Sequence, residues 1–297
     1  MKIPPHFFHS LSLGLFWGVT PSLYKYLADI NMPVLHTIFY SGMIVGLIML
    51  GYVLTRPRRR KIDLRVVAYG FGCAALMNTP FAINLYLAAY VPPTELSIIV
   101  TLAPFFNYLF AMTIRHESAT PRRMMAIVLG FTSTLVLILS HEGVISGQIS
   151  WPLIASLSIP LLYSVYDSFA AHAWPQGADT IQAGAFESLW SGAIAFPLIL
   201  WFSPFAAAGN PTLLQHWAVV LLALTWVVER VVFFTLITER GAVFTAQSIY
   251  ISTPTAVVMS VVFFGGGTDI WLWVSLAILM GAVYLNNSGG AAKPQIA

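Results

Sequence analysis

Charged residues are scarce in this chain. Asp, Glu, Lys and Arg together make up only 8% of its 297 residues, whereas soluble domains carry about 25%. Hydrophobic residues make up 58%, and the mean hydropathy is +0.80. A surface so poor in charge is unsuited to water. The composition therefore predicts an integral membrane protein, for which the number of membrane spans matters more than the number of soluble domains.

Cysteine is also scarce, and cofactor-binding motifs are absent from the sequence. The single Cys73 excludes a disulfide framework and a cysteine-based metal site. The sequence contains no P-loop, no glycine-rich nucleotide cradle and no H-E-x-x-H motif. We therefore expect no metal, no cofactor and no ATP-driven step within this chain. The net charge of +3 gives no indication of nucleic-acid binding.

Long apolar runs, separated by polar or Pro/Gly-containing segments, predict an all-α fold of ten transmembrane helices. Each run approaches the roughly 20 residues that a helix needs to cross the hydrocarbon core. No small-residue cleavage site follows the first run, so we expect it to be retained as a helix. The predicted spans are 7–27, 33–54, 65–88, 93–114, 122–140, 150–172, 179–203, 214–238, 241–264 and 269–287.

Basic residues gather on one predicted side of the membrane. They lie after the second span, after the fourth and eighth spans, and near both ends of the chain: Arg56, Arg58, Arg59, Arg60, Lys61, Arg65, Arg115, Arg122, Arg123, Arg240, Lys2 and Lys293. By the positive-inside rule this side faces the cytoplasm. We therefore expect a multi-pass protein of a bacterial cytoplasmic membrane with both termini in the cytoplasm.

The two halves of the chain show weak, ordered similarity. Leu15–Val19 resembles Leu161–Val165, and Thr101–Pro104 resembles Ile251–Pro254. The matches predict two repeats, residues 1–145 and 146–297. Since each repeat would hold five spans, an odd number, the second must enter the membrane inverted, as in many secondary transporters.

These residues also carry a resemblance to a known family. Trp17-Gly18, the stretch from Ala88 through Pro104 to Glu117, and the stretch from Gly241 through Pro254 resemble the drug/metabolite transporter superfamily in its ten-helix EamA-type branch. The resemblance implies a non-enzymatic carrier of small molecules, with the aromatic amino-acid exporters of that branch as an analogy. Its implied partners are a small-molecule substrate and the lipid bilayer, with the chain a monomer or a homodimer.

Three charged residues interrupt apolar spans, where each charge costs about 2.5–3.5 kcal/mol on insertion scales. Glu187 and Arg230 fall at similar predicted depths, so we predict an ion pair that acts as an inner gate. Glu229 points about 100° away from Arg230 on the same helix, and we expect it to face the substrate or protons. The alternative is a static salt bridge between two helices.

A second group of residues is predicted to line the substrate pathway, from repeat matching or from nearness to proline residues. When the two repeats are aligned, Thr79-Pro80 match Glu229-Arg230, and Tyr40 matches Glu187. The first-repeat residues that correspond to the three charged residues are therefore neutral, and they lie near the side predicted to be outer. The pathway residues are Trp17, Tyr40, Asn78, Thr79, Tyr163, Glu229 and Tyr250. An apolar pocket with few polar groups suits neutral or aromatic amino acids. Each residue could instead serve packing alone.

Proline residues are predicted to break three spans, at Pro80, Pro104 and Pro254, because proline lacks the backbone N–H that a helix needs. Helix breaks suit a binding site at a repeat interface, although they can also serve helix packing alone. Asp167 is a possible proton site, with a solvated position as the alternative.

The leading hypothesis is a secondary carrier that exports or exchanges small metabolites by alternating access. Uptake, or a different class of metabolite or drug, is the nearest alternative. An intramembrane enzyme would have to use Glu229 and Asp167 as acid and base, without any nucleophile or metal motif to support them. A channel or a non-transporting scaffold is a third possibility.

Overall fold

The computed structural model describes residues 5–56, 62–115, 121–140, 150–202, 212–265 and 269–287, and the regular secondary structure of these ranges is entirely α-helical. Part of the predicted basic loop, 57–61, and the junction between the predicted repeats, 141–149, lie outside the described residues. The helices are α1 (Pro5–Asp29), α2 (Val34–Thr55), α3 (Leu64–Leu87), α4 (Pro93–Val100), α5 (Ala103–Arg115), α6 (Pro121–Ser140), α8 (Trp151–Ser156), α9 (Ser158–His172), α10 (Thr180–Phe202), α12 (Leu213–Ala246), α13 (Ile249–Phe264) and α14 (Ile270–Asn287).

Over the described ranges these helices form ten spans, since α4 with α5 and α8 with α9 each fill one predicted span. The predicted all-α fold of ten spans is thus confirmed. The boundary between the eighth and ninth spans lies inside α12, which is interrupted at Gly241. The φ of Gly241 is 79° and its ψ is 174°, a backbone conformation that a residue with a Cβ rarely adopts.

Two spans are each divided near a proline: the fourth, where a break at Pro104 is predicted, and the sixth, where none is predicted. The ring of a proline clashes with the carbonyl four residues earlier. Pro104 is four residues after Val100, where α4 ends, and Pro160 is four residues after Ser156, where α8 ends. The helix break expected at Pro104 therefore lies just before it. In contrast, α3 continues through Pro80 and α13 continues through Pro254.

Six stretches of the described residues are long and apolar enough to cross a membrane: Val34–Thr55, Leu64–Leu87, Pro93–Thr113, Trp151–His172, Thr180–Phe202 and Leu213–Ala246. Met124–Val136, Ile249–Phe264 and Ile270–Ala282 are shorter apolar helices. Large apolar side chains also face outward, among them Trp201 at 82% exposed and Leu213 at 74%. Side chains of this kind are stable against lipid, so the chain is a multi-pass membrane protein.

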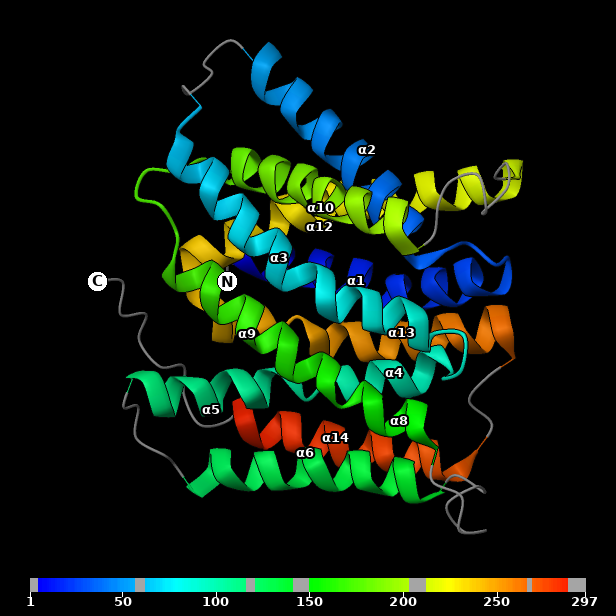
Figure 1. The fold of residues 1–297 in the computed structure, drawn as a ribbon. Helices are drawn as coiled ribbons and strands as arrows, with labels where there is room; N and C mark the ends of the chain where they lie inside the picture. The colour runs from blue at the N-terminus through cyan, green and yellow to red at the C-terminus, as the bar shows by residue number, and fades with distance from the viewer. Residues whose placement is uncertain are drawn as a thin grey trace.

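The helices lie side by side in a bundle with two distinct edges (Figure 1). At one edge α2 packs along α10, and at the opposite edge α6 packs along α14. Between these edges, helices of the first half pack against helices of the second half: α1 contacts α12 and α13, and α9 contacts α3 and α5. The centre of the bundle is therefore a seam between the two halves.

Glycine allows the closest approaches across this seam. A Cβ at Gly14 would lie 2.5 Å from the carbonyl oxygen of Ser248, and one at Gly18 would lie 2.7 Å from that of Ser252. Gly14 and Gly18 are four residues apart, so they lie on one face of α1. This small-xxx-small spacing is typical of helices that pack closely in membranes.

Candidate functional site

A cavity of about 100 Å³ lies at the seam between the two halves. Its walls come from α1, α3, α4 and α5 of the first half and from α9, α12 and α13 of the second. The volume is several times the roughly 10–15 Å³ that a buried water needs. The lining residues are mostly aromatic or apolar, with the charged residues Asp167, Glu229 and Arg230 among them.

Arg230 lies close to Glu187, its predicted partner, at the edge of the cavity. Arg230 Nη1 is 3.4 Å from Glu187 Oε1, and the Glu187 side chain is 0% exposed. Among the described residues, neither carboxyl oxygen of Glu187 accepts a hydrogen bond of good geometry, although the hydroxyl of Tyr166 lies close to this carboxylate. The guanidinium of Arg230 also lies over the ring of Trp226, 5.5 Å from its centroid. The arginine is thus placed by one carboxylate and one aromatic face.

Glu229 faces the cavity from the same helix but has different partners. Thr20 Oγ1 on α1 lies 2.9 Å from Glu229 Oε1, in hydrogen-bond geometry. The same hydroxyl also lies 3.0 Å from the carbonyl oxygen of Phe16, one turn earlier. Arg230 therefore links α12 to α10, whereas Glu229 links α12 to α1.

Asp167 lines the cavity from a different helix, α9. Its side chain is 6% exposed, and its Oδ2 accepts a hydrogen bond of 2.9 Å from Nδ2 of Asn107 on α5. One turn earlier, Ser164 Oγ donates to the carbonyl oxygen of Ala103 at 2.8 Å. Asp167 is therefore packed within the bundle between the two halves, and not at a solvent-exposed helix end.

Two of the predicted pathway aromatics, Trp17 and Tyr163, also line the cavity. Asn84 Nδ2 donates to the hydroxyl of Tyr163 at 3.4 Å, and Trp17 packs near Phe233 with ring centroids 6.3 Å apart. Tyr166 stacks on Phe233 at 5.4 Å. Aromatic side chains from both halves therefore surround the charged groups.

The other predicted pathway residues do not line this cavity. Thr79 is exposed, and Tyr40 packs against Phe39 with ring centroids 5.3 Å apart. Asn78 Nδ2 donates to the carbonyl oxygen of Ser191 on α10 at 3.1 Å.

Helix periodicity explains where Asn78 and Tyr250 lie. Met77 and Asn84, seven residues apart on α3, line the cavity, so Asn78 is turned about 100° away from that face. The same holds on α13, where Ile249 and Ser252 line the cavity and Tyr250 lies between them.

Helix periodicity also accounts for cavity residues that were not predicted from the sequence. On α1 the cavity is lined by Trp17, Thr20 and Tyr24, and on α12 by Trp226, Glu229, Arg230 and Phe233. Both sets follow the i, i+3, i+7 spacing of one helix face. Extending that spacing from Trp17 and from Glu229 would have found them.

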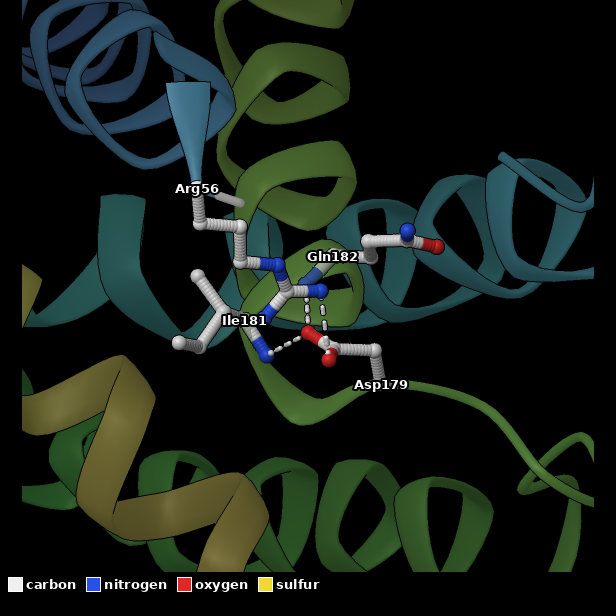
Figure 2. A network of polar contacts seen from close by, with 4 residues as sticks. All are labelled: Arg56, Asp179, Ile181 and Gln182. Atoms are coloured by element: carbon white, nitrogen blue, oxygen red, sulfur yellow. Dashed lines mark hydrogen bonds and ion pairs between the residues drawn. The ribbon is translucent and has the colours of Figure 1, made fainter. Parts of the chain in front are cut away.

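A second charged contact joins the two halves away from the cavity. Arg56, directly after α2, donates to Oδ2 of Asp179 at 2.7 Å, as Figure 2 shows. Oδ1 of Asp179 accepts from the backbone N–H groups of Ile181 and Gln182, at 3.0 and 3.1 Å. Asp179 therefore caps the first turn of α10 and pairs with Arg56 at the same time.

Within the described ranges, no three His, Cys, Asp or Glu side chains come together as metal ligands would. The charged groups of the cavity can instead pair with a charged group of a ligand or exchange protons. Ion pairing and proton exchange both depend on carboxylates and a guanidinium that are shielded from water, where interactions between charges are strong.

Comparison with known proteins gives matches of two kinds, to a family model and to solved structures. The model of the EamA-like transporter family matches residues 7–139. A solved structure titled "Crystal structure of protein" superposes with a TM-score of 0.63 at 17% sequence identity, covering 95% of this chain and 96% of that chain. At this identity the superposition shows the fold alone. No curated protein matches the sequence.

Proposed function

We propose that this chain, whose residues 7–139 match the model of the EamA-like transporter family, is a secondary carrier of small substrates that works by alternating access. The observation that carries the proposal is the cavity at the seam, which combines aromatic walls with Asp167, Glu229 and Arg230. Buried charge of this kind is costly in a membrane protein and commonly marks a substrate or ion pathway.

Reciprocal contacts between the two halves support the proposed inverted repeats, residues 1–145 and 146–297. Ser133 Oγ on α6 is 2.8 Å from the carbonyl oxygen of Ser275 on α14, and Ser275 Oγ is 2.8 Å from that of Ser133. Such mutual contacts are typical of two units related by a twofold axis. Two such units can rock about a central site and expose it to each side in turn.

Contacts at the helix ends agree with the proposed orientation. Arg56 follows the second span and Asp179 precedes the seventh, so both belong to the side proposed to be cytoplasmic. On the side proposed to be outer, Gln215 Nε2 donates to the carbonyl oxygen of Ile30 at 2.9 Å. Both termini would then be cytoplasmic, in a bacterial inner membrane.

The cavity also supports the choice of substrate class. Its aromatic rings provide an apolar surface for a hydrocarbon or aromatic group, and its charged groups suit an ionised end of the same molecule. Neutral and aromatic amino acids, moved outward, are therefore the first substrates to test. In this scheme Glu187 and Arg230 form an inner gate that opens when their ion pair separates.

Purified protein reconstituted into liposomes provides the test. Liposomes preloaded with unlabelled phenylalanine should take up labelled phenylalanine by saturable counterflow, and protein-free liposomes should not. A panel of other metabolites, with and without a proton gradient, extends the test to other substrates. Ion currents without saturable counterflow of any metabolite would instead indicate a channel.

A further inference from the structure

The charges around the cavity do not balance when every group is ionised. Asp167, Glu229 and Arg230 line it, and Glu187 pairs with Arg230 from behind. That set holds three carboxylates and one guanidinium, an excess of two negative charges in a region shielded from water. Two uncompensated charges are costly there, so they require protons or a bound cation.

The hydrogen bonds of Thr20 are consistent with a proton on Glu229. Thr20 Oγ1 lies 2.9 Å from Glu229 Oε1 and 3.0 Å from the carbonyl oxygen of Phe16. A hydroxyl has one hydrogen, so it cannot donate to both when Glu229 is ionised. When Glu229 is protonated, its carboxylic acid donates to Thr20 and Thr20 donates to Phe16, and both contacts are satisfied.

The hydrogen bond of Asp167 allows the opposite charge state. Its Oδ2 accepts from the amide Nδ2 of Asn107, which can only donate. That bond is strongest to an ionised carboxylate. Oδ1 hydrogen-bonds to no other residue in the part of the chain that the structure describes. With Arg230 neutralised by Glu187, Asp167 is then the uncompensated negative charge of the cavity.

We propose that Asp167 is the binding site for the ammonium group of the transported molecule, and that this molecule is an aromatic amine and not an amino acid. The inference rests on the proposed carrier function and replaces amino acids with aromatic amines as its substrate class. Tyr163 lies one turn before Asp167 on the same face of α9, and Trp17 from α1 and Phe233 from α12 also line the cavity. These rings provide an apolar and cation-attracting surface beside the carboxylate.

The carboxylate of an amino acid has no matching partner in this arrangement. The only guanidinium in the cavity lining, that of Arg230, already pairs with Glu187 at 3.4 Å. An amino acid would bring a second negative charge into the cavity and would have to break this pair to neutralise it. An amine brings only the positive charge that Asp167 lacks.

The test compares three ligands that share one ring and differ in charge: phenethylamine, phenylalanine and 3-phenylpropionate. Each is added as an unlabelled competitor to proteoliposomes that carry out counterflow of labelled phenethylamine. We expect phenethylamine to compete at least tenfold more strongly than phenylalanine, and phenylpropionate not to compete. D167N should lower the apparent affinity for phenethylamine at least tenfold. The control D269N, at an exposed residue that precedes α14, should leave it unchanged.

The outcomes separate the two proposals. Saturable counterflow of phenylalanine that phenethylamine does not inhibit would overturn the amine site and leave the carrier function in place. No saturable counterflow of any probe or metabolite would overturn the carrier function itself. Because the competition series uses the unmodified protein, the amine site remains testable even where D167N fails to fold. Equal affinity of well-folded D167N and unmodified protein would also overturn it.

Discussion

Arg230 Nη1 lies 3.4 Å from Glu187 Oε1, and this pair connects α12 to α10 where both side chains are buried. Neither oxygen of Glu187 accepts a hydrogen bond of good geometry from the described residues, although the Tyr166 hydroxyl lies close by. A buried ion pair with such incomplete hydrogen bonding returns little of the energy that removing its charges from water costs. The pair is therefore better suited to separating during transport than to holding the bundle together.

Removing one member of this pair should be more harmful than removing both. E187Q leaves the guanidinium of Arg230 buried without a counter-charge, which we expect to cost about 3–5 kcal/mol of stability. The double variant E187Q/R230Q carries no buried charge and should lose much less. Thermal unfolding of the two variants in detergent provides the comparison.

Transport by these variants separates a gate from a static brace. If the pair is a gate, R230Q should abolish or slow counterflow at normal protein levels, and the double variant should not recover it. A static salt bridge predicts the opposite, since the double variant would restore both stability and counterflow together.

Thr20 provides a test of the protonation of Glu229. T20V keeps the shape of the side chain but removes the hydroxyl that Glu229 contacts at 2.9 Å. An unpartnered buried polar group costs about 1–3 kcal/mol, so T20V should lower the unfolding temperature in detergent.

The infrared spectrum of the purified protein shows directly whether Glu229 carries a proton. The carbonyl band of a protonated carboxylic acid should be present in the unmodified protein, shifted in T20V and absent in E229Q. A band that persists unchanged in E229Q would show that the proton lies elsewhere.

The close contact between α1 and α13 predicts a steric effect at Gly18. A Cβ there would lie 2.7 Å from the carbonyl oxygen of Ser252, so the two helices must move apart. We expect G18A to cost about 1–3 kcal/mol, as overpacking does elsewhere. Gly51 on α2 is the matched control, because nothing lies within 4 Å of its added Cβ. G51A should leave the melting temperature unchanged or raise it; equal destabilisation by the two variants would contradict the packing argument.

Sequence patterns predict the spans well because each span is an apolar run between polar segments. The break between α8 and α9 was not predicted, because Pro160 lies inside such an apolar run. The clash of its ring with the Ser156 carbonyl does not change the hydropathy of the run. The Glu187–Arg230 contact was predictable, since opposite charges in an apolar environment are stable mainly together.

The cavity residues depend on information that a linear pattern lacks. Asn78 and Asn84 have the same side chain and lie on the same helix, yet only Asn84 lines the cavity. Choosing between them requires the rotation of α3 about its own axis, which is set by packing against other helices. The contact between Thr20 and Glu229, 209 residues apart in sequence, likewise requires knowing that α1 packs on α12.

The Arg56–Asp179 pair is expected to control opening at the end of the bundle where α2 ends and α10 begins (Figure 2). Both side chains are partly exposed, at 17% and 16%, so the pair should contribute less than about 1 kcal/mol to stability. D179N keeps the helix cap, because Asn caps as well as Asp, but removes the charge that holds Arg56. D179A removes both the helix cap and the charge.

We therefore expect D179N to leave the melting temperature nearly unchanged while a cysteine placed at Gln182 becomes more reactive to a water-soluble thiol reagent. D179A should increase this reactivity and also lower the melting temperature. If D179N does not alter the reactivity, the pair only caps and braces α10, and opening at this end must be controlled by the buried Glu187–Arg230 contact instead.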